Sequence, residues 1–150
     1  MDKLYISNSA LTSAALAINA AGSATIKTVN TVNYKIDGVL YTGVAGTTIT
    51  TPTTISIPTL TTTPITVSVN AAGSFTLTAG TGVLTATVIA GSANAICLRS
   101  QLAEVPASQA LVGYVVVKNA AATTWVGGTT AFDAANVTST YINVPMAVTF

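Results

Sequence analysis

The hydrophobic and polar positions along this chain follow two patterns, and the change between them falls near residue 22. In residues 1–22, apolar side chains such as Leu11 and Ile18 recur at a spacing that fits one face of a short helix. Beyond residue 24 the alternation has a period of two, which is typical of β-strands. We therefore expect an N-terminal arm or short helix in residues 1–22 and a β-sandwich domain in residues 23–150.

The clearest local signal is a hairpin centred on Asp37 and Gly38. Strand-forming residues flank this pair on both sides, in 33–36 and 39–42. The Asp-Gly dipeptide tolerates the positive φ angles of a two-residue type I′ turn. The pattern therefore predicts a tight hairpin here and gives Asp37 a structural role in the turn rather than a catalytic one.

Further period-two segments fill the rest of the chain. Residues 65–69 and 75–78 predict a second hairpin with its turn at 70–73. The other strands are expected at 83–89, 95–98, 111–118, 138–144 and 146–150. At least eight short strands with frequent turn signals predict an all-β fold, an antiparallel β-sandwich or barrel.

A threonine-rich segment, residues 47–66, contains Pro52, Pro58 and Pro64 at an even spacing. Threonine is β-branched and favours strands, whereas proline denies the sheet a backbone donor. The segment is therefore predicted to form extended edge strands with breaks at the prolines.

Charged side chains are sparse, and this feature bears on assembly rather than on the fold. The 150 residues include only five basic and four acidic side chains, whereas soluble domains are about one-quarter charged. A monomer of this size exposes about 7,000 Å², so each charge serves about 800 Å² of surface. Because small domains rely on charged surfaces to stay dispersed, we expect a subunit whose surface is covered by other copies or by a larger assembly.

No residue constellation predicts catalysis, a metal site or a cofactor. The chain has no histidine, its single cysteine is Cys97, and no Ser-x-x-Lys spacing occurs. The five scattered basic residues do not predict nucleic-acid binding, and no apolar run is long enough to span a membrane. The sequence thus predicts a protein that is not an enzyme and has no cofactor and no small-molecule substrate.

The candidate site is a partner interface. Apolar side chains near the N-terminus imply docking on the chain's own core or on a neighbour, and Trp125 in a glycine-rich loop is a candidate interface anchor. The other tyrosines and phenylalanines fit cross-strand core pairs better than a sugar-binding platform. The interface residues expected are Leu4, Tyr5, Ile6, Leu11, Leu16, Ile18 and Trp125.

Three stretches, residues 32–42, 111–117 and 127–137, together resemble small virion structural proteins of tailed bacteriophages, of the head decoration (cement) or head-fibre type. The resemblance covers about a fifth of the chain and leaves the threonine-rich centre unmatched. It implies a non-enzymatic capsid decoration protein on the outer capsid surface of the virion. It further implies a homotrimer that binds the major capsid protein and stabilises contacts between its copies.

Two other classes remain open from the sequence. A receptor-binding or glycan-binding tail-fibre or head-fibre module would present exposed aromatic residues in its loops. A self-assembling filament or surface-layer subunit would account for the sparse charge equally well.

Overall fold

The structure is a computed structural model that describes residues 8–84 and 101–144. All regular elements in this part of the chain are β-strands, which confirms the predicted all-β fold. They are β1 (Ser9–Ala10), β2 (Leu16–Ile18), β3 (Thr25–Thr28), β4 (Val32–Ile36), β5 (Val39–Gly43), β6 (Thr48–Thr50), β7 (Ser56–Ile57), β8 (Thr61–Asn70), β9 (Phe75–Ala79), β10 (Val83–Leu84), β11 (Gln109–Asn119), β12 (Trp125–Val126) and β13 (Val137–Asn143). The strands expected at 95–98 and 146–150 and most of that at 83–89 lie outside the described residues.

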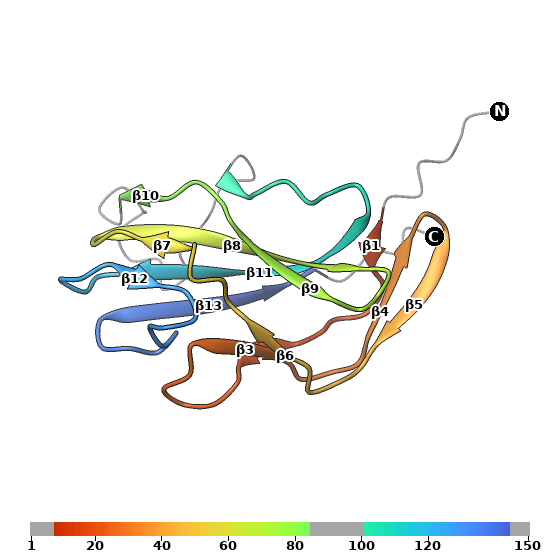
Figure 1. The fold of residues 1–150 in the computed structure, drawn as a ribbon, viewed down its shortest axis with the longest axis horizontal. Helices are drawn as coiled ribbons and strands as arrows, with labels where there is room; N and C mark the ends of the chain where they lie inside the picture. The colour runs from red at the N-terminus through yellow and green to blue at the C-terminus, as the bar shows by residue number, and fades with distance from the viewer. Residues whose placement is uncertain (1–7, 85–100, 145–150) are drawn as a thin grey trace.

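The largest sheet is a strongly curled, mostly antiparallel one built around the two long strands β8 and β11 (Figure 1). Its strands follow the order β10-β8-β11-β1-β4-β5, with β9 also paired to β8 and β13 also paired to β11. A three-stranded sheet, β2-β3-β6, packs beside it, and a short pair joins β7 to β12. Within the described residues β1 and β11 run parallel, and the other strand pairs are antiparallel.

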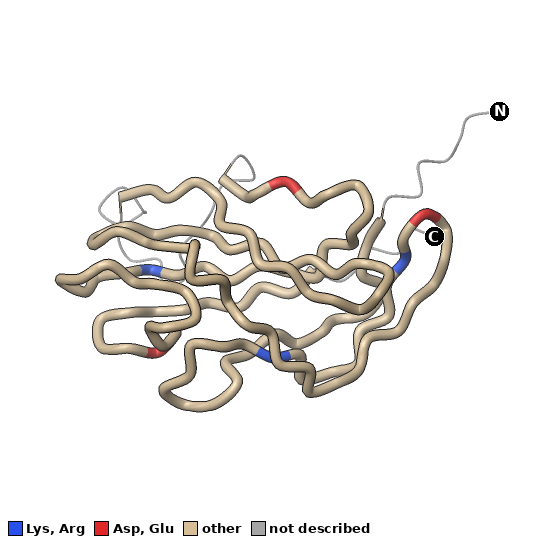
Figure 2. Tube along the Cα trace, in the orientation of Figure 1, with Lys and Arg blue, Asp and Glu red and all other residues tan. Residues whose placement is uncertain are grey.

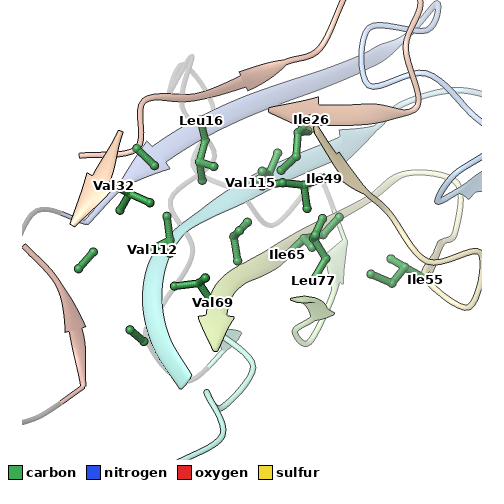
Figure 3. Packing of buried hydrophobic residues seen from close by; sticks show 14 of the residues in the cluster. Leu16, Ile26, Val32, Ile49, Ile55, Ile65, Val69, Leu77, Val112 and Val115 are labelled. Atoms are coloured by element: carbon green, nitrogen blue, oxygen red, sulfur yellow. The ribbon is translucent and has the colours of Figure 1, made fainter. Parts of the chain in front are cut away.

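The hydrophobic core lies between the two larger sheets. Ile65 on β8 and Val115 on β11 are opposite each other and fully buried. Leu16, Ile26 and Ile49 reach the same cluster from the β2-β3-β6 sheet (Figure 3). Apolar side chains on the inner faces of both sheets thus exclude water between them, as in a sandwich.

Both predicted hairpins form. In the first, β4 pairs with β5 across a turn in which Asp37 has a φ of 50° and Gly38 a φ of 86°, the two positive values that a type I′ turn needs. In the second, β8 pairs with β9, and the Oδ1 atom of Asn70 accepts hydrogen bonds from turn N–H groups. The turn residues identified in the sequence therefore determine both hairpin turns.

The threonine-rich segment departs from its prediction at Pro64. Pro52 and Pro58 do lie between strands, but β8 runs through Pro64 and is a central strand rather than an edge. The Pro64 carbonyl accepts a hydrogen bond of 2.8 Å from Gly80 N. Because the N and O atoms of a strand residue point to the same side, the missing donor faces away from β11 and leaves that ladder intact.

On the side of β8 that faces away from β11, the partner strand changes from β10 to β9 at Pro64. This change explains why proline is tolerated there. Thr62 pairs with β10, and Ile65 pairs with β9. Pro64 lies between these two pairings, where the ladder is already interrupted. The expectation of an edge strand was wrong. Composition does not reveal that the hydrogen-bond ladder can break on one side of β8 while the ladder to β11 continues on the other side.

The N-terminal segment forms strands, so the short-helix alternative is wrong for its described residues, 8–22. β1 pairs with β4 and β11, and β2 pairs with β3. Between them Ala15 has a φ of 48°, and the Ala14 carbonyl accepts from the N–H groups of Val29 and Asn30. Pairing with strands far along the chain therefore outweighs the helical spacing of the apolar residues.

Candidate interaction surface

The interface residues expected from the sequence do not gather on one exposed surface of the described chain. Leu4, Tyr5 and Ile6 lie outside the described residues. Leu16 is 4% exposed and belongs to the core, and Ile18 packs against that core. Leu11 is half-buried in the bend after β1.

Trp125 is also a core residue, because its side chain is only 1% exposed. It lies on β12 opposite Ile57 of β7, and its ring packs on Phe132 with centroids 5.1 Å apart. Its indole N–H donates to the Ala131 carbonyl at 3.0 Å. The structure thus satisfies both the apolar and the polar part of this side chain internally, and Trp125 offers no anchor to a partner.

Asn119, at the end of β11, organises the loops around Trp125. Its side chain is fully buried, and its Nδ2 atom donates to the carbonyls of Ile57, Pro58 and Thr123 at 3.0, 3.2 and 2.9 Å. Its Oδ1 atom accepts from Ala121 N at 3.1 Å. No role was predicted for Asn119 from the sequence, where the available signal was an asparagine that follows an apolar run and precedes a turn.

Asp133 ties the loop after β12 to the turn between β2 and β3. Its two carboxylate oxygens lie 3.1 and 3.0 Å from Gly22 N, and Phe132 N donates to the Ser23 carbonyl. Burial, with a smaller contribution from Asp133, raises the pKa of the nearby Tyr141 phenol to about 12. This carboxylate therefore has a structural role.

The described residues also lack the other usual marks of a catalytic centre. No group of three metal-ligating side chains occurs among residues 8–84 and 101–144. Burial, and secondarily the neighbouring Tyr41, raises the pKa of Tyr34, so this phenol stays protonated at neutral pH. A depression of about 340 Å³ beside β8 and β10 is lined by small or aliphatic side chains, including Ser56, Thr61 and Thr63, and none of the residues that line it is ionisable.

Exposed apolar side chains instead mark two ends of the molecule. The first group, the β5 patch, comprises Val29, Val39, Leu40 and Val44, which are 49%, 53%, 63% and 74% exposed. The Thr28 Oγ1 atom donates to the Val44 carbonyl, so the loop after β5 lies beside the segment that carries Val29. Val39 and Leu40 lie on β5 at the edge of the largest sheet and, as consecutive strand residues, project to opposite faces of that sheet. The β5 patch therefore surrounds this edge and is a candidate contact region.

The second group, the β10 patch, comprises Leu60 and Leu84, which are 60% and 63% exposed. Leu84 lies opposite Thr61, the residue after Leu60, in the β8–β10 pairing. β10 and β5 lie at opposite ends of the long axis of the molecule (Figure 1). The chain therefore presents exposed apolar side chains at both ends.

Charges do not gather at either patch or anywhere else in the described chain. The six described charged side chains are Lys27, Lys35, Asp37, Glu104, Lys118 and Asp133. They are scattered along the trace (Figure 2): Lys27 is two residues from Val29, and Lys35 and Asp37 belong to the β4–β5 hairpin. Neither an electropositive groove for nucleic acid nor an acidic cluster is formed by these residues.

A scan against protein-family models, a search of curated proteins and a search of solved structures each found no match to this chain. Among the residues that the structure describes, no helix is long and apolar enough to cross a membrane.

Proposed function

We propose that this chain is a non-enzymatic decoration (cement) protein of a tailed-bacteriophage capsid, which binds the outer capsid surface and stabilises contacts between copies of the major capsid protein. The observation that carries the proposal is a β-sheet domain with widely spaced charges and large apolar side chains exposed at both ends. The resemblance of residues 32–42, 111–117 and 127–137 to phage virion proteins supports the location. It also supports a homotrimer as the bound form.

Such a protein acts by contact alone. Packaged DNA exerts pressure on the capsid, and a protein that spans a joint between capsomers resists opening by burying surface on both sides. Each Å² of apolar surface buried contributes about 25 cal/mol before the costs of association are subtracted. The side chains of Val39, Leu40 and Leu60 are suited to this role because each is more than half exposed.

The glycan-binding alternative finds less support. A sugar platform needs an aromatic ring that is open to solvent, and every aromatic side chain among residues 8–84 and 101–144 is buried or half-buried. Tyr34 and Tyr41 stack on each other across β4 and β5 with centroids 5.5 Å apart. Their geometry fits the cross-strand pair expected from the sequence rather than a ligand platform.

A co-sedimentation experiment tests the proposal. Purified protein is mixed with expanded phage capsids that lack it, and capsid-bound protein is measured after centrifugation, with unexpanded procapsids as the comparison. We expect saturable binding to expanded capsids and a rise in the temperature at which they rupture. Binding to neither particle, together with a positive glycan array, would replace this proposal with the receptor-binding alternative.

The contribution of the N-terminal residues to capsid binding must be tested with a deletion that is shorter than the predicted arm. Removing residues 1–20 would also remove β1 and β2, including the buried Ala10 and Leu16, and would damage the core. Removing residues 1–7 leaves Asn8, whose Oδ1 atom accepts from Asp37 N at 2.8 Å. If Leu4, Tyr5 and Ile6 dock on the capsid, this deletion lowers capsid occupancy at least tenfold while the melting temperature is unchanged; full occupancy would exclude these three residues from the interface.

A further inference from the structure

β5 is the terminal strand of the largest sheet, and its outer edge is not paired with any described strand. Natural edge strands are usually protected by a lysine, a proline, a bulge or a covering loop. β5 has the sequence Val39-Leu40-Tyr41-Thr42-Gly43, with no charge and no proline, and it pairs with β4 in an uninterrupted register. Within residues 8–84 and 101–144, this edge therefore lacks the usual features that prevent pairing with another chain.

The direction of the β5 backbone groups follows from hydrogen bonds on the far side of β4. The Asn33 carbonyl accepts from Leu11 N at 2.7 Å, and Asn33 N donates to the Thr12 Oγ1 atom at 2.8 Å. Asn33 therefore points away from β5, and its partner Thr42 forms a non-hydrogen-bonded pair with it. Because these pairs alternate, the N–H and C=O groups of Leu40 and Thr42 point outward from the sheet edge.

We propose that β5 pairs with β5 of a second copy of this chain, antiparallel and with the two-fold axis at Tyr41. In this register Leu40 lies opposite Thr42 of the second copy, and Thr42 lies opposite its Leu40. Both are hydrogen-bonded pairs, so the outward N–H and C=O groups of these residues form about four interchain bonds. The two sheets then join into one continuous sheet, and the edge is no longer open.

The second copy suits this edge for two reasons beyond hydrogen bonding. First, a two-fold antiparallel contact needs a strand that is complementary to itself, and the outward residues Leu40 and Thr42 are equidistant from Tyr41. Second, like charges stay apart: Asp37 lies beyond one end of β5, so its two copies fall at opposite ends of the joined strands. Leu40, 63% exposed in one chain, gains a neighbour in the other.

This pairing depends on β5 alone, and it would hold whether or not the chain binds a capsid. It is compatible with a three-fold contact elsewhere on the surface, since that contact would use a different face. A protein with both contacts would contain six chains, and a protein with the β5 contact alone would contain two.

The first test removes one outward N–H group. The Thr42→Pro variant lacks the backbone N–H that would donate to the second copy, but it breaks no backbone hydrogen bond to β4. Thr42→Val is the matched control, because both variants lose the 2.9 Å bond from Thr42 Oγ1 to Asn33 Oδ1 while valine keeps the N–H. We expect light scattering at equal concentration to show a halved mass for Thr42→Pro, from two chains to one or from six to three, and the wild-type mass for Thr42→Val.

The second test locates the two-fold axis by disulfide formation in a Cys97→Ser background. The two Tyr41 positions form a non-hydrogen-bonded pair, whose Cα atoms lie about 4.5 Å apart, within the range that a disulfide spans. The two Val44 positions are separated by six residues along the strands, about 20 Å. We expect Tyr41→Cys to form a covalent dimer and Val44→Cys to remain uncrosslinked, although Val44 is the more exposed residue.

Three results would overturn the pairing. One is a wild-type protein that contains a single chain or three chains at concentrations up to about 100 μM. Another is an unchanged mass for Thr42→Pro when circular dichroism shows that it is folded. The third is crosslinking of Val44→Cys that is as fast as that of Tyr41→Cys, because random collision favours the more exposed thiol.

Discussion

Replacing Asn119 by alanine is the sharpest test of how the loops around Trp125 are held. The alanine side chain removes a fully buried amide that donates to three backbone carbonyls and accepts from one N–H. It leaves those backbone groups without their partners while the strand β11 continues unchanged. The loss should therefore appear as lower stability rather than as a different fold.

The size of the effect follows from the burial of each bond. The bond to the Ile57 carbonyl is buried, and leaving such an acceptor unsatisfied costs about 1–3 kcal/mol. The bonds to Pro58 and Thr123 are part-buried, so water replaces some of their energy and each contributes about 0.5–1.5 kcal/mol. The sum is about 4 kcal/mol, a large part of the roughly 5–15 kcal/mol that stabilises a typical domain.

Urea unfolding at fixed protein concentration measures this loss. We expect a lower midpoint with an unchanged m-value, and a melting temperature lower by about 8–16 °C. Asn33→Ala is the control, because the Asn33 side chain makes an exposed hydrogen bond to Thr42 Oγ1 and its loss should cost less than about 1 kcal/mol. A loss below about 1 kcal/mol for Asn119→Ala would show that this amide does not hold the loops.

Three further predictions concern hydroxyl groups and one glycine. Tyr34→Phe should cost about 0.5–1.5 kcal/mol because the Tyr34 hydroxyl donates to the Asn70 carbonyl, whereas Tyr141→Phe should cost almost nothing at pH 7 because the buried Tyr141 hydroxyl has no hydrogen-bond partner among the described residues; equal losses in urea unfolding would contradict this contrast. The Tyr141 pKa is raised from 10.0 to about 12, so the unfolded chain releases this proton first; stability should fall between pH 10 and 12, and less steeply in Tyr141→Phe. Gly113→Ala should lower stability by about 1–3 kcal/mol because its new Cβ atom would lie 2.5 Å from the Ile142 carbonyl oxygen, and a melting temperature equal to that of the wild type would disprove the close approach.

Local sequence signals predicted those parts of the fold that local geometry determines. The hairpin at Asp37 and Gly38 was predictable because two adjacent residues with positive φ angles fix the turn and, through it, the register of β4 and β5. The strand β11 was predictable because a nearly continuous apolar run is expected where both faces of a strand are buried. Neither inference required knowledge of a distant segment.

Features that depend on distant segments were not predictable. The spacing of Leu11 and Ile18 fits a helix, but the carbonyl of Ala14 bonds to residues that follow β3, and this pairing is absent from the local pattern. Trp125 resembled an exposed anchor because its loop is glycine-rich, yet Phe132 and Ile57 enclose it from segments far apart in the chain. The open edge of β5 was hidden for the same reason, because strand order decides which strand has no outer neighbour.

The sparse charge has different consequences inside and on the surface. Most of the side-chain bonds that join distant segments among the described residues are neutral: Asn119 binds Pro58 in the β7–β8 connection, and Tyr34 binds Asn70 at the end of β8. Neutral bonds of this kind need no ionised partner, so the fold loses little by having nine charges. On the surface, the scarcity of charged side chains removes the repulsion that keeps chains apart. It also leaves β5, with Leu40 and its outward backbone groups, without a charged residue that would oppose pairing. The composition therefore bears on association rather than on folding, which is why the edge strand, and not a cavity or a charged cluster, is where this chain should meet another copy of itself.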